Sequence, residues 1–243
     1  MSKLGLIALL NLTLVVTAAA QKSIYSKPYE RWTVDEAWRI LTNSPWAQID
    51  TDMGRASGVS YLLEVRLYSA LPVRQAIVRR MQLTIPYDKL TREQKADYDA
   101  QVDGLLKCSE CEKHYIVTLF STVRDPLELS IPGNQFPPTQ MKKLVDVVAF
   151  LKRFPRDELL RHISLTNDKG ERRAAVNVSF TAKRNEIVFL FPRLDDHGNP
   201  LLTEANKKFT FDIAPELFKK EGMELRKITF EVRKLVQNGQ VIF

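Results

Sequence analysis

The pattern of apolar positions near the start of the chain is helical. Apolar residues recur at intervals of three and four just after Thr33, which places them on one face of a helix. Thr33 and Glu36 have the spacing of a capping box, and Asn43-Ser44-Pro45 ends the run. The sequence therefore predicts a helix with one buried face. The residues expected on that face are Val34, Ala37, Trp38 and Leu41.

Two later segments have the pattern of strands. Apolar side chains alternate with others from Val59 to Leu67, which is strand spacing with one strongly apolar face. The run from Tyr115 to Phe120 is apolar on both faces apart from Thr118. Since a strand that is buried on both faces lies inside a sheet, we expect the second segment to be central.

Three further helices are predicted around these strands. One opens near Pro72, and another begins at Thr91, with Gln94 as its capping-box partner, and runs toward Leu106. The polar middle of this second helix predicts a surface position. The third ends at Phe154-Pro155. The first helix is expected to turn outward Arg74, Arg79 and Arg80, and the third to bury Met141, Leu144, Val145, Val148 and Leu151.

After Pro155 the pattern predicts strands alone. Short apolar runs alternate with turns rich in Asn, Asp and Gly, which is typical of an antiparallel sheet or a small sandwich. The predicted strands are Leu159 to Leu165, Ala174 to Thr181, Ile187 to Phe191, Phe209 to Ile213 and Leu225 to Val236. Asn238-Gly239 would fold Val241 to Phe243 back as a terminal hairpin.

These elements predict an α+β fold, in which a mixed helix and strand half packs with an antiparallel β-rich half. The mixed region covers residues 21–155 and the β-rich region residues 156–243. No Gly/Ser-rich linker separates them, so one continuous domain over 21–243 stays open beside two domains.

Composition excludes several classes of protein. The chain has 243 residues, of which 44% are hydrophobic, with 12 Pro, 9 Gly and 2 Cys. These values do not fit a disordered, a collagen-like or a disulfide-rich chain. The chain is therefore long and apolar enough to bury a sizeable core.

Residues 1–20 have the pattern of a secretory signal peptide. A basic start at Lys3 precedes an apolar run from Leu4 to Val16, and Ala18-Ala19-Ala20 offers small residues before a cut at Gln21. The run is shorter than the roughly 20 residues that a membrane-spanning helix needs. We expect export to the periplasm or the outside, with a retained anchor as the alternative and no transmembrane segment after signal removal.

The charge excess is small and scattered. Lys and Arg total 36 against 29 Asp and Glu, a net charge of +7. The basic residues form separate pairs such as Arg79-Arg80 and Arg172-Arg173, near acidic residues, rather than one basic face with aromatics. No nucleic-acid partner is therefore predicted, and the partner class expected is an unidentified protein or envelope component.

Cys108 and Cys111 are the sharpest local feature. In an exported protein this pair predicts a structural disulfide, a redox-active pair or half of a metal site. The pair follows a helix and precedes a strand, against the thioredoxin order, and Glu112 stands where haem attachment needs histidine. His114 would be a third zinc ligand, but the sequence suggests no fourth. A structural disulfide is favoured, although so short a loop gains only about 2 kcal/mol.

The sequence shows no assembled catalytic motif. It lacks H-E-x-x-H, G-x-S-x-G, a Walker loop and G-x-G-x-x-G. His114, His162 and His197 have no catalytic spacing, although a triad drawn from distant positions stays open. Asp195 to Asn199 is predicted to be a plain turn rather than a calcium loop. No catalytic residue, metal or cofactor is predicted.

Three tryptophans, Trp32, Trp38 and Trp46, stand close together. One interpretation is an aromatic patch that binds a partner, and the other is that the rings dock the first helix onto the core. Docking is favoured. If the Trp38 ring is in the core, its replacement by alanine is expected to cost about 3 kcal/mol or more.

The same segment carries a resemblance. The pattern W-x3-E-A-x2-I-L-x2-S-P-W-A, from Trp32 to Ala47, resembles a motif near the mature N-terminus of a family of uncharacterised exported bacterial proteins of similar size. The remainder of the chain is only loosely similar. The G-W-x-T-D motif of a group often placed beside this family is absent, so the chain is not assigned to that group. The resemblance implies export and a shared fold, and it implies no activity, ligand or catalytic residue.

The sequence thus favours a non-catalytic binding protein of the cell envelope that acts through its β-rich half or its tryptophan segment. The first alternative is a thiol-dependent redox or metal-binding protein that uses Cys108 and Cys111. The second is a hydrolase with a dispersed triad.

Overall fold

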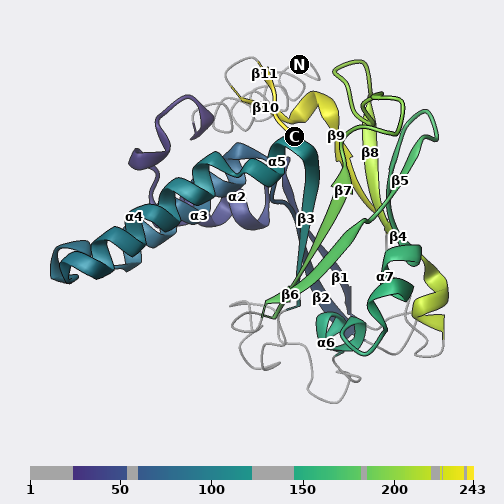
Figure 1. The fold of residues 1–243 in the computed structure, drawn as a ribbon, viewed down its shortest axis with the longest axis horizontal. Coiled ribbons are helices and arrows are strands. Elements are labelled where there is room, and N and C mark those ends of the chain that lie inside the picture. Colours follow the sequence, from purple (N-terminus) through teal and green to yellow (C-terminus); the bar gives the residue numbers. More distant parts are fainter. Residues whose placement is uncertain are drawn as a thin grey trace, which may run out of the picture.

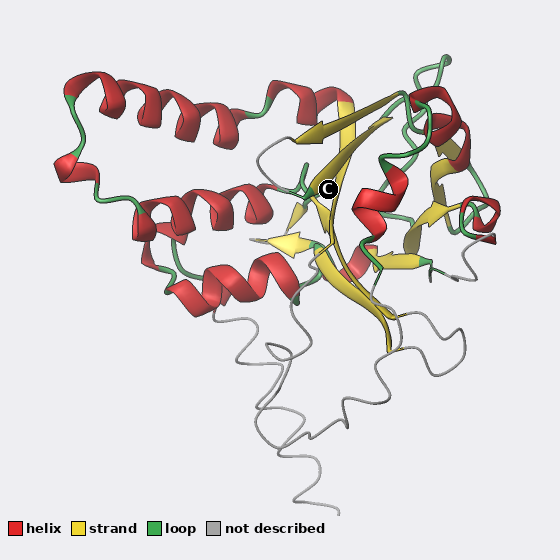
Figure 2. Ribbon diagram, turned by 90° about the horizontal axis from the view of Figure 1, so that it is seen from below, coloured by secondary structure: helices red, strands yellow, loops and turns green. Residues whose placement is uncertain are grey.

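The computed structural model describes residues 24–53, 60–121, 145–181, 185–219, 225, 227–237 and 240–243. These residues form an α+β fold, as predicted, with a larger and a smaller antiparallel sheet. The helices α2, α3 and α4 lie on one side of the larger sheet and the smaller sheet lies on the other (Figures 1 and 2). The signal-peptide prediction falls outside the described residues.

The helices and sheets have the following bounds. The helices are α2 (Val34–Thr42), α3 (Leu71–Thr84), α4 (Arg92–Lys107), α5 (Ser109–Lys113), α6 (Val147–Leu151) and α7 (Arg156–His162). The larger sheet runs in the order β1 (Ala47–Met53), β2 (Ser60–Leu67), β3 (His114–Ser121), β7 (Glu186–Pro192), β6 (Asn177–Thr181). The smaller sheet runs β5 (Arg172–Ala174), β4 (Ile163–Asn167), β8 (Lys208–Ile213), β9 (Ile228–Glu231). β10 (Val236–Gln237) and β11 (Gln240–Val241) form the terminal pair.

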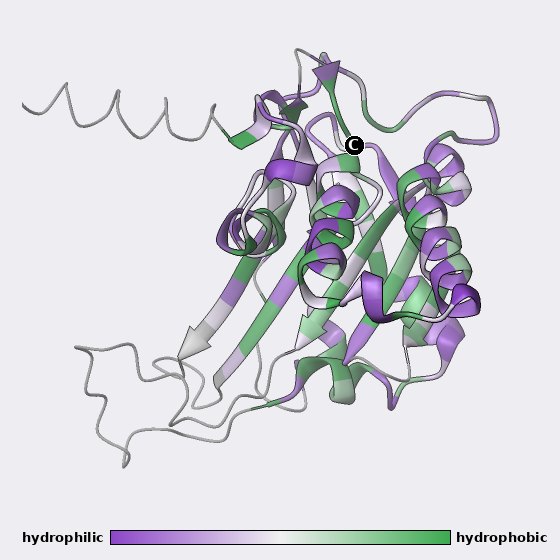
Figure 3. Ribbon diagram, turned by 90° about the vertical axis from the view of Figure 1, so that its left-hand side faces the viewer, coloured by the Kyte–Doolittle hydropathy of each residue, from purple (hydrophilic) through white to green (hydrophobic). Residues whose placement is uncertain are grey.

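Aromatic side chains join the two sheets. Phe189 and Phe191 on β7 contact Phe211 on β8, with ring centroids 6.0 and 6.1 Å apart. At the edge, the Gln48 side-chain amide on β1 donates a hydrogen bond to the Thr229 carbonyl on β9 (2.7 Å). Hydrophobic residues follow the strands through this region (Figure 3). The core therefore lies mainly between the sheets, because alternate side chains of each strand point to that side.

The predicted centre of the larger sheet is confirmed. β3 pairs with β2 on one side and with β7 on the other. Since β7 and β6 follow Pro155 in the chain, strands from both sides of that residue share one sheet. The boundary at Pro155 therefore does not coincide with a boundary between sheets.

Helix α2 begins as predicted but buries a different face. Its Thr33 and Glu36 form the predicted capping box. Ile40 is buried with Ala37 and Leu41, whereas Val34 is 53% exposed and Trp38 is 36% exposed. The predicted face was wrong at Val34 and Trp38, because the side of the helix that joins the core carries Ala37, Ile40 and Leu41.

The capping box yields a prediction about pH. Burial raises the pKa of Glu36, but hydrogen bonds from Lys27 and Thr33 outweigh it and hold that pKa below its usual value. A lowered folded-state pKa adds stability above the unfolded value, and this stability is lost as pH falls through the folded value. Glu36→Gln keeps an acceptor for Thr33 but removes the charge and the pair with Lys27, so it should lower the free energy of unfolding by roughly 0.5 kcal/mol at pH 7 and by less in acid.

Urea unfolding of both proteins between neutral and acidic pH measures this difference. Glu93→Gln is the matched control, because Glu93 also lies in the first turn of a helix but makes no capping hydrogen bond to Thr91. A difference for Glu36→Gln that stays constant down to acid pH would contradict the expected linkage.

Two strand predictions after Pro155 were wrong. Helix α7 occupies Arg156–His162, so the strand expected from Leu159 starts only at Ile163. Pro155 precedes the helix, and acidic residues in its first turn and basic residues in its last favour the helix dipole. The run from Ala174 to Thr181 divides between β5 and β6, which belong to different sheets.

The last predicted strand and the hairpin are partly confirmed. Within the run from Leu225 to Val236, the strand β9 ends at Glu231 and a 3-10 turn follows at Val232–Lys234. β10 and β11 pair antiparallel, as the hairpin prediction requires. Its turn residues, Asn238 and Gly239, lie outside the described residues, as do Met141 and Leu144 of the predicted helix that ends in α6.

Candidate functional site

A groove of about 580 Å³ lies between the larger sheet and the helical hairpin of α3 and α4. Its apolar and aromatic lining consists of Tyr68, Ile77, Met81, Leu105, Ile116, Phe120 and Val188. Its polar lining consists of Arg66, Gln101, Thr118, Thr181 and Glu186. The groove thus combines a mainly apolar surface with a few polar groups.

Strand register builds the floor of the groove. Arg66 on β2 lies opposite Thr118 on β3, and Thr118 lies opposite Val188 on β7. The next row along the strands is formed in the same way by Glu64, Phe120 and Glu186. Because side chains alternate between faces, these residues share the face of the sheet that turns away from the smaller sheet.

The helical hairpin forms the wall. α3 contributes Ile77 and Met81, while α4 contributes Gln101 and Leu105. The two helices pack against each other, and none of the α4 residues is buried. The surface position predicted for α4 is thus confirmed, and the apolar side chains that α4 does carry remain available to the groove.

Arg66 is the charged centre of the floor and is only 7% exposed. Its Nε donates to the Leu41 carbonyl (2.6 Å), its Nη2 donates to the Glu64 carboxylate (2.5 Å), and its guanidinium lies 4.1 Å from the centroid of the Phe120 ring. Burial lowers the pKa of Arg66, and the carboxylates of Glu64 and Glu186 oppose that shift. Arg66 is therefore a fixed cation suited to positioning rather than to proton transfer.

The tryptophans divide into two classes. Trp32 and Trp46 are completely buried, so they dock the N-terminal segment and do not form a partner-binding surface. Their indole nitrogens donate to the carbonyls of Ile24 and Ile242, each at 2.9 Å. Only Trp38 is accessible, and the Arg80 guanidinium covers its ring at 4.7 Å. Complete burial therefore removes two of the three residues from the predicted anchor patch.

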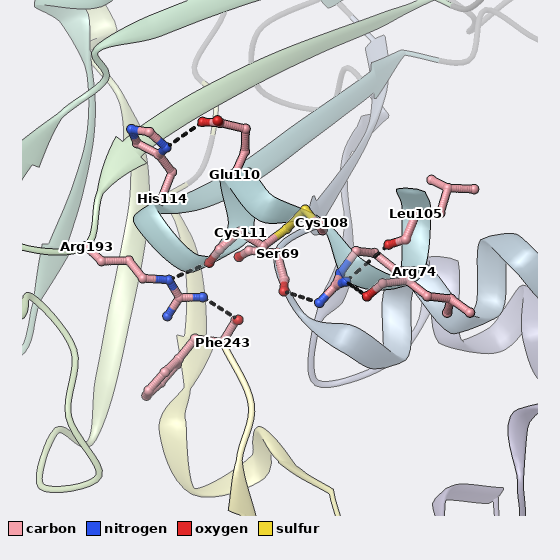
Figure 4. The surroundings of a disulfide bond; sticks show 10 residues. Ser69, Arg74, Leu105, Cys108, Glu110, Cys111, His114, Arg193 and Phe243 are labelled. Atoms are coloured by element: carbon pink, nitrogen blue, oxygen red, sulfur yellow. Dashed lines mark hydrogen bonds and ion pairs between the residues drawn. A yellow bond between two sulfur atoms is a disulfide. The ribbon is translucent and has the colours of Figure 1, made fainter. Parts of the chain in front are cut away.

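Cys108 and Cys111 lie at disulfide distance, with sulfurs 1.99 Å and Cα atoms 5.3 Å apart. The pair joins the end of α4 to α5, directly before β3 (Figure 4). His114 Nδ1 lies 3.1 Å from a carboxylate oxygen of Glu110. The two sulfurs are thus bonded to each other. His114, named above as a third zinc ligand, lies beside Glu110.

Arg74, predicted to point outward, points inward at the same corner. It is 7% exposed, and its Nη1 donates to the carbonyls of Leu105 and Leu106 while its Nη2 donates to the Ser69 carbonyl. The last carbonyls of α4 have no partner within the helix, so a guanidinium from the neighbouring helix can satisfy them. The carbonyls that Arg74 binds belong to another helix, so the spacing of residues along α3 could not predict that its side chain points inward.

The other two histidines lie apart from the disulfide corner in sequence and in the fold. His162 is the last residue of α7, and His197 lies in the turn after β7. The turn prediction is confirmed, because Asp195 Oδ1 accepts hydrogen bonds from the amides of His197 and Asn199. Within the described ranges, no group of three His, Cys, Asp or Glu side chains is placed to bind a metal ion.

The groove residues were missed as a site, although one signal was present in the sequence. Glu64 and Arg66 stand two residues apart inside a strongly apolar strand, so opposite charges share one face of β2. A charge pair of this kind indicates that the face of the strand opposite its apolar face is also covered by other parts of the protein.

The part of the chain that the structure describes contains no helix both long and apolar enough for a membrane crossing. Comparison with known protein families, with curated proteins and with solved structures finds no match to this chain.

Proposed function

We propose that this chain is an exported, non-catalytic binding protein and that the groove between the helical hairpin and the larger sheet holds the apolar part of its ligand. The observation that carries the proposal is the lining, in which seven apolar or aromatic side chains surround a space of about 580 Å³. Ligand sites in proteins have this size and this combination of an apolar lining with a few fixed polar groups.

The chemistry of the lining supports binding over catalysis. Arg66 is held by Glu64, Leu41 and Phe120, so its charge is fixed. Thr118 and Thr181 line the groove, where the Thr181 hydroxyl donates a hydrogen bond to the Glu186 carboxylate (3.3 Å). No histidine or cysteine is among the described lining residues. This arrangement favours orientation of a bound molecule.

Export is part of the same proposal. It is supported by the leader-like pattern of residues 1–20, by the resemblance of Trp32 to Ala47 to exported bacterial proteins, and by the cysteine pair at disulfide distance. The metal-binding alternative has less support, since the two joined sulfurs offer no thiolate to a metal ion. The dispersed triad has less support, since no histidine is among the described residues that line the groove.

Binding of an apolar fluorophore tests the groove. N-phenyl-1-naphthylamine is uncharged, and its fluorescence rises in apolar surroundings. Val188→Trp places a large ring on the groove floor and is expected to weaken its binding at least about tenfold, which corresponds to roughly 1.4 kcal/mol. Fluorescence titration of purified wild-type and variant proteins measures this change.

Val176→Trp is the matched control, because Val176 is 50% exposed and does not line the groove. Binding to this variant should equal binding to the wild type, and circular dichroism should show the same fold for all three proteins. Undetectable binding to the wild type, or equal binding to both variants, would remove the groove from the proposed function.

A further inference from the structure

Helix α4 is a groove wall with few attachments. None of its residues is buried, and its main packing partner is α3. Near the middle of α4, Tyr98 contacts the ring of Tyr87 in the connection from α3 edge to face at 5.3 Å, and Asp99 accepts a hydrogen bond from the Tyr87 hydroxyl. The position of the groove end of α4 therefore depends on what holds its last turn.

That last turn is held at the disulfide corner. The buried Arg74 side chain donates hydrogen bonds to the carbonyls of Leu105 and Leu106. Leu105 also lines the groove. Leu105 therefore has two roles: its carbonyl helps to fix the end of α4, and its side chain lines the groove.

Cys108 and Cys111 attach this turn to the sheet. Cys108 ends α4 in a left-handed conformation with φ 43°, which a residue with a Cβ atom adopts at a cost in free energy. Cys111 is 5% exposed, and its carbonyl accepts a hydrogen bond from the Arg193 side chain (2.8 Å). Arg193 follows β7 directly and also donates to the Phe243 carbonyl. Cys108 thus ends the helix that forms part of the groove wall, and Cys111 lies in α5, which leads directly into β3 (Figure 4).

We propose that the Cys108–Cys111 disulfide is a redox-sensitive clasp for the groove, an inference that rests on the proposed binding function. In the oxidised protein the crosslink keeps the end of α4 against the sheet. In the reduced protein Cys108 leaves its left-handed conformation, the last turn of α4 loosens, and the ligand dissociates more readily.

The chemistry is thiol–disulfide exchange with a dithiol reductant. Cys108 is partly exposed and Cys111 is buried, so a thiolate of the reductant attacks the Cys108 sulfur. The disulfide breaks, and Cys111 leaves as a thiolate that takes up a proton. The second thiol of the reductant then attacks the mixed disulfide and releases Cys108 as a thiol. The reductant supplies two electrons and two protons and becomes a disulfide.

Hydrogen exchange and fluorophore binding test the clasp together. Three samples are compared: oxidised protein, protein reduced with dithiothreitol, and the double variant Cys108→Ser/Cys111→Ser. Reduction is expected to raise amide exchange over residues 92–107 about tenfold and to leave β3 and β7 unchanged. Binding of N-phenyl-1-naphthylamine should weaken about tenfold. The double variant should match the reduced protein and should not respond to dithiothreitol.

The outcomes separate the two proposals. Unchanged exchange over residues 92–107 after reduction overturns the clasp, and so does a rise that is equally large in β3 and β7, because the disulfide is then a general staple. If the oxidised protein does not bind the fluorophore, the proposed function fails and the exchange data still decide whether α4 is released. If binding is tight in both redox states, the result supports the groove as the binding site and contradicts the redox-sensitive clasp.

Discussion

Replacing Trp46 by alanine is expected to lower the free energy of unfolding by about 4 kcal/mol. The indole ring is completely buried, packs against the edge of Tyr25 at 5.1 Å between centroids, and donates a hydrogen bond to the Ile242 carbonyl. The substitution removes the largest kind of core side chain and leaves the partly buried Ile242 carbonyl without this donor. Urea unfolding followed by circular dichroism measures the loss.

Trp38→Ala is the matched control for this prediction. The Trp38 ring is 36% exposed, and its described ring contact is the Arg80 guanidinium at 4.7 Å. An exposed contact of this kind contributes only about 0.5–1 kcal/mol, so the cost first expected for a core Trp38 does not apply. Equal losses for the two variants would show that burial does not distinguish these rings.

Replacing Arg66 by methionine is expected to cost about 3–5 kcal/mol, because it removes one partner of a buried ion pair. Side chains of Arg66 and Glu64 are only 9% and 8% exposed. Methionine fills part of the space over Phe120, but it leaves the Glu64 carboxylate and the Leu41 carbonyl without a donor. The free energy of unfolding should therefore fall far more than the change in volume explains.

A double-mutant cycle separates charge from packing. Glu64→Leu/Arg66→Met removes both charges and should be more stable than Arg66→Met alone, because the unpaired carboxylate is gone. Lys107→Met breaks an exposed pair with Asp103, whose side chains are 76% and 59% exposed, and should cost less than about 1 kcal/mol. A small loss for Arg66→Met, similar to that for Lys107→Met, would contradict a buried pair.

The parts of the fold that local sequence determines could be predicted. Both capping boxes, at Thr33 and at Thr91, depend on residues three positions apart, and both form. β2 and β3 have strong apolar patterns, and both were found. β1 was missed because an edge strand with Gln48, Asp50 and Asp52 has no clear apolar alternation, and its existence depends on pairing with β2.

The candidate site could not be predicted, since distant pairing creates it. The sequence places Arg66, Thr118 and Val188 on three separate strands, and only the order β2-β3-β7 brings them into one row. Arg74 was predicted to point outward, because the α4 carbonyls that bind it are more than thirty residues away in the sequence. By contrast, the cysteine pair is local, and the structural disulfide that the sequence favoured over a redox or a metal-binding pair agrees with the observed bond.

The pairing of β3 with β7 also determines how this chain reaches its structure. β3 ends at Ser121 and β7 begins at Glu186, and the hydrogen bond from Trp46 to Ile242 joins positions 196 residues apart. Contacts between such distant positions must overcome the entropy of closing long loops, so they slow folding relative to a helical protein of this length. Until β7 arrives, the edge of β3 and its apolar side chains are open to other chains, which makes the incomplete sheet the stage most prone to aggregation.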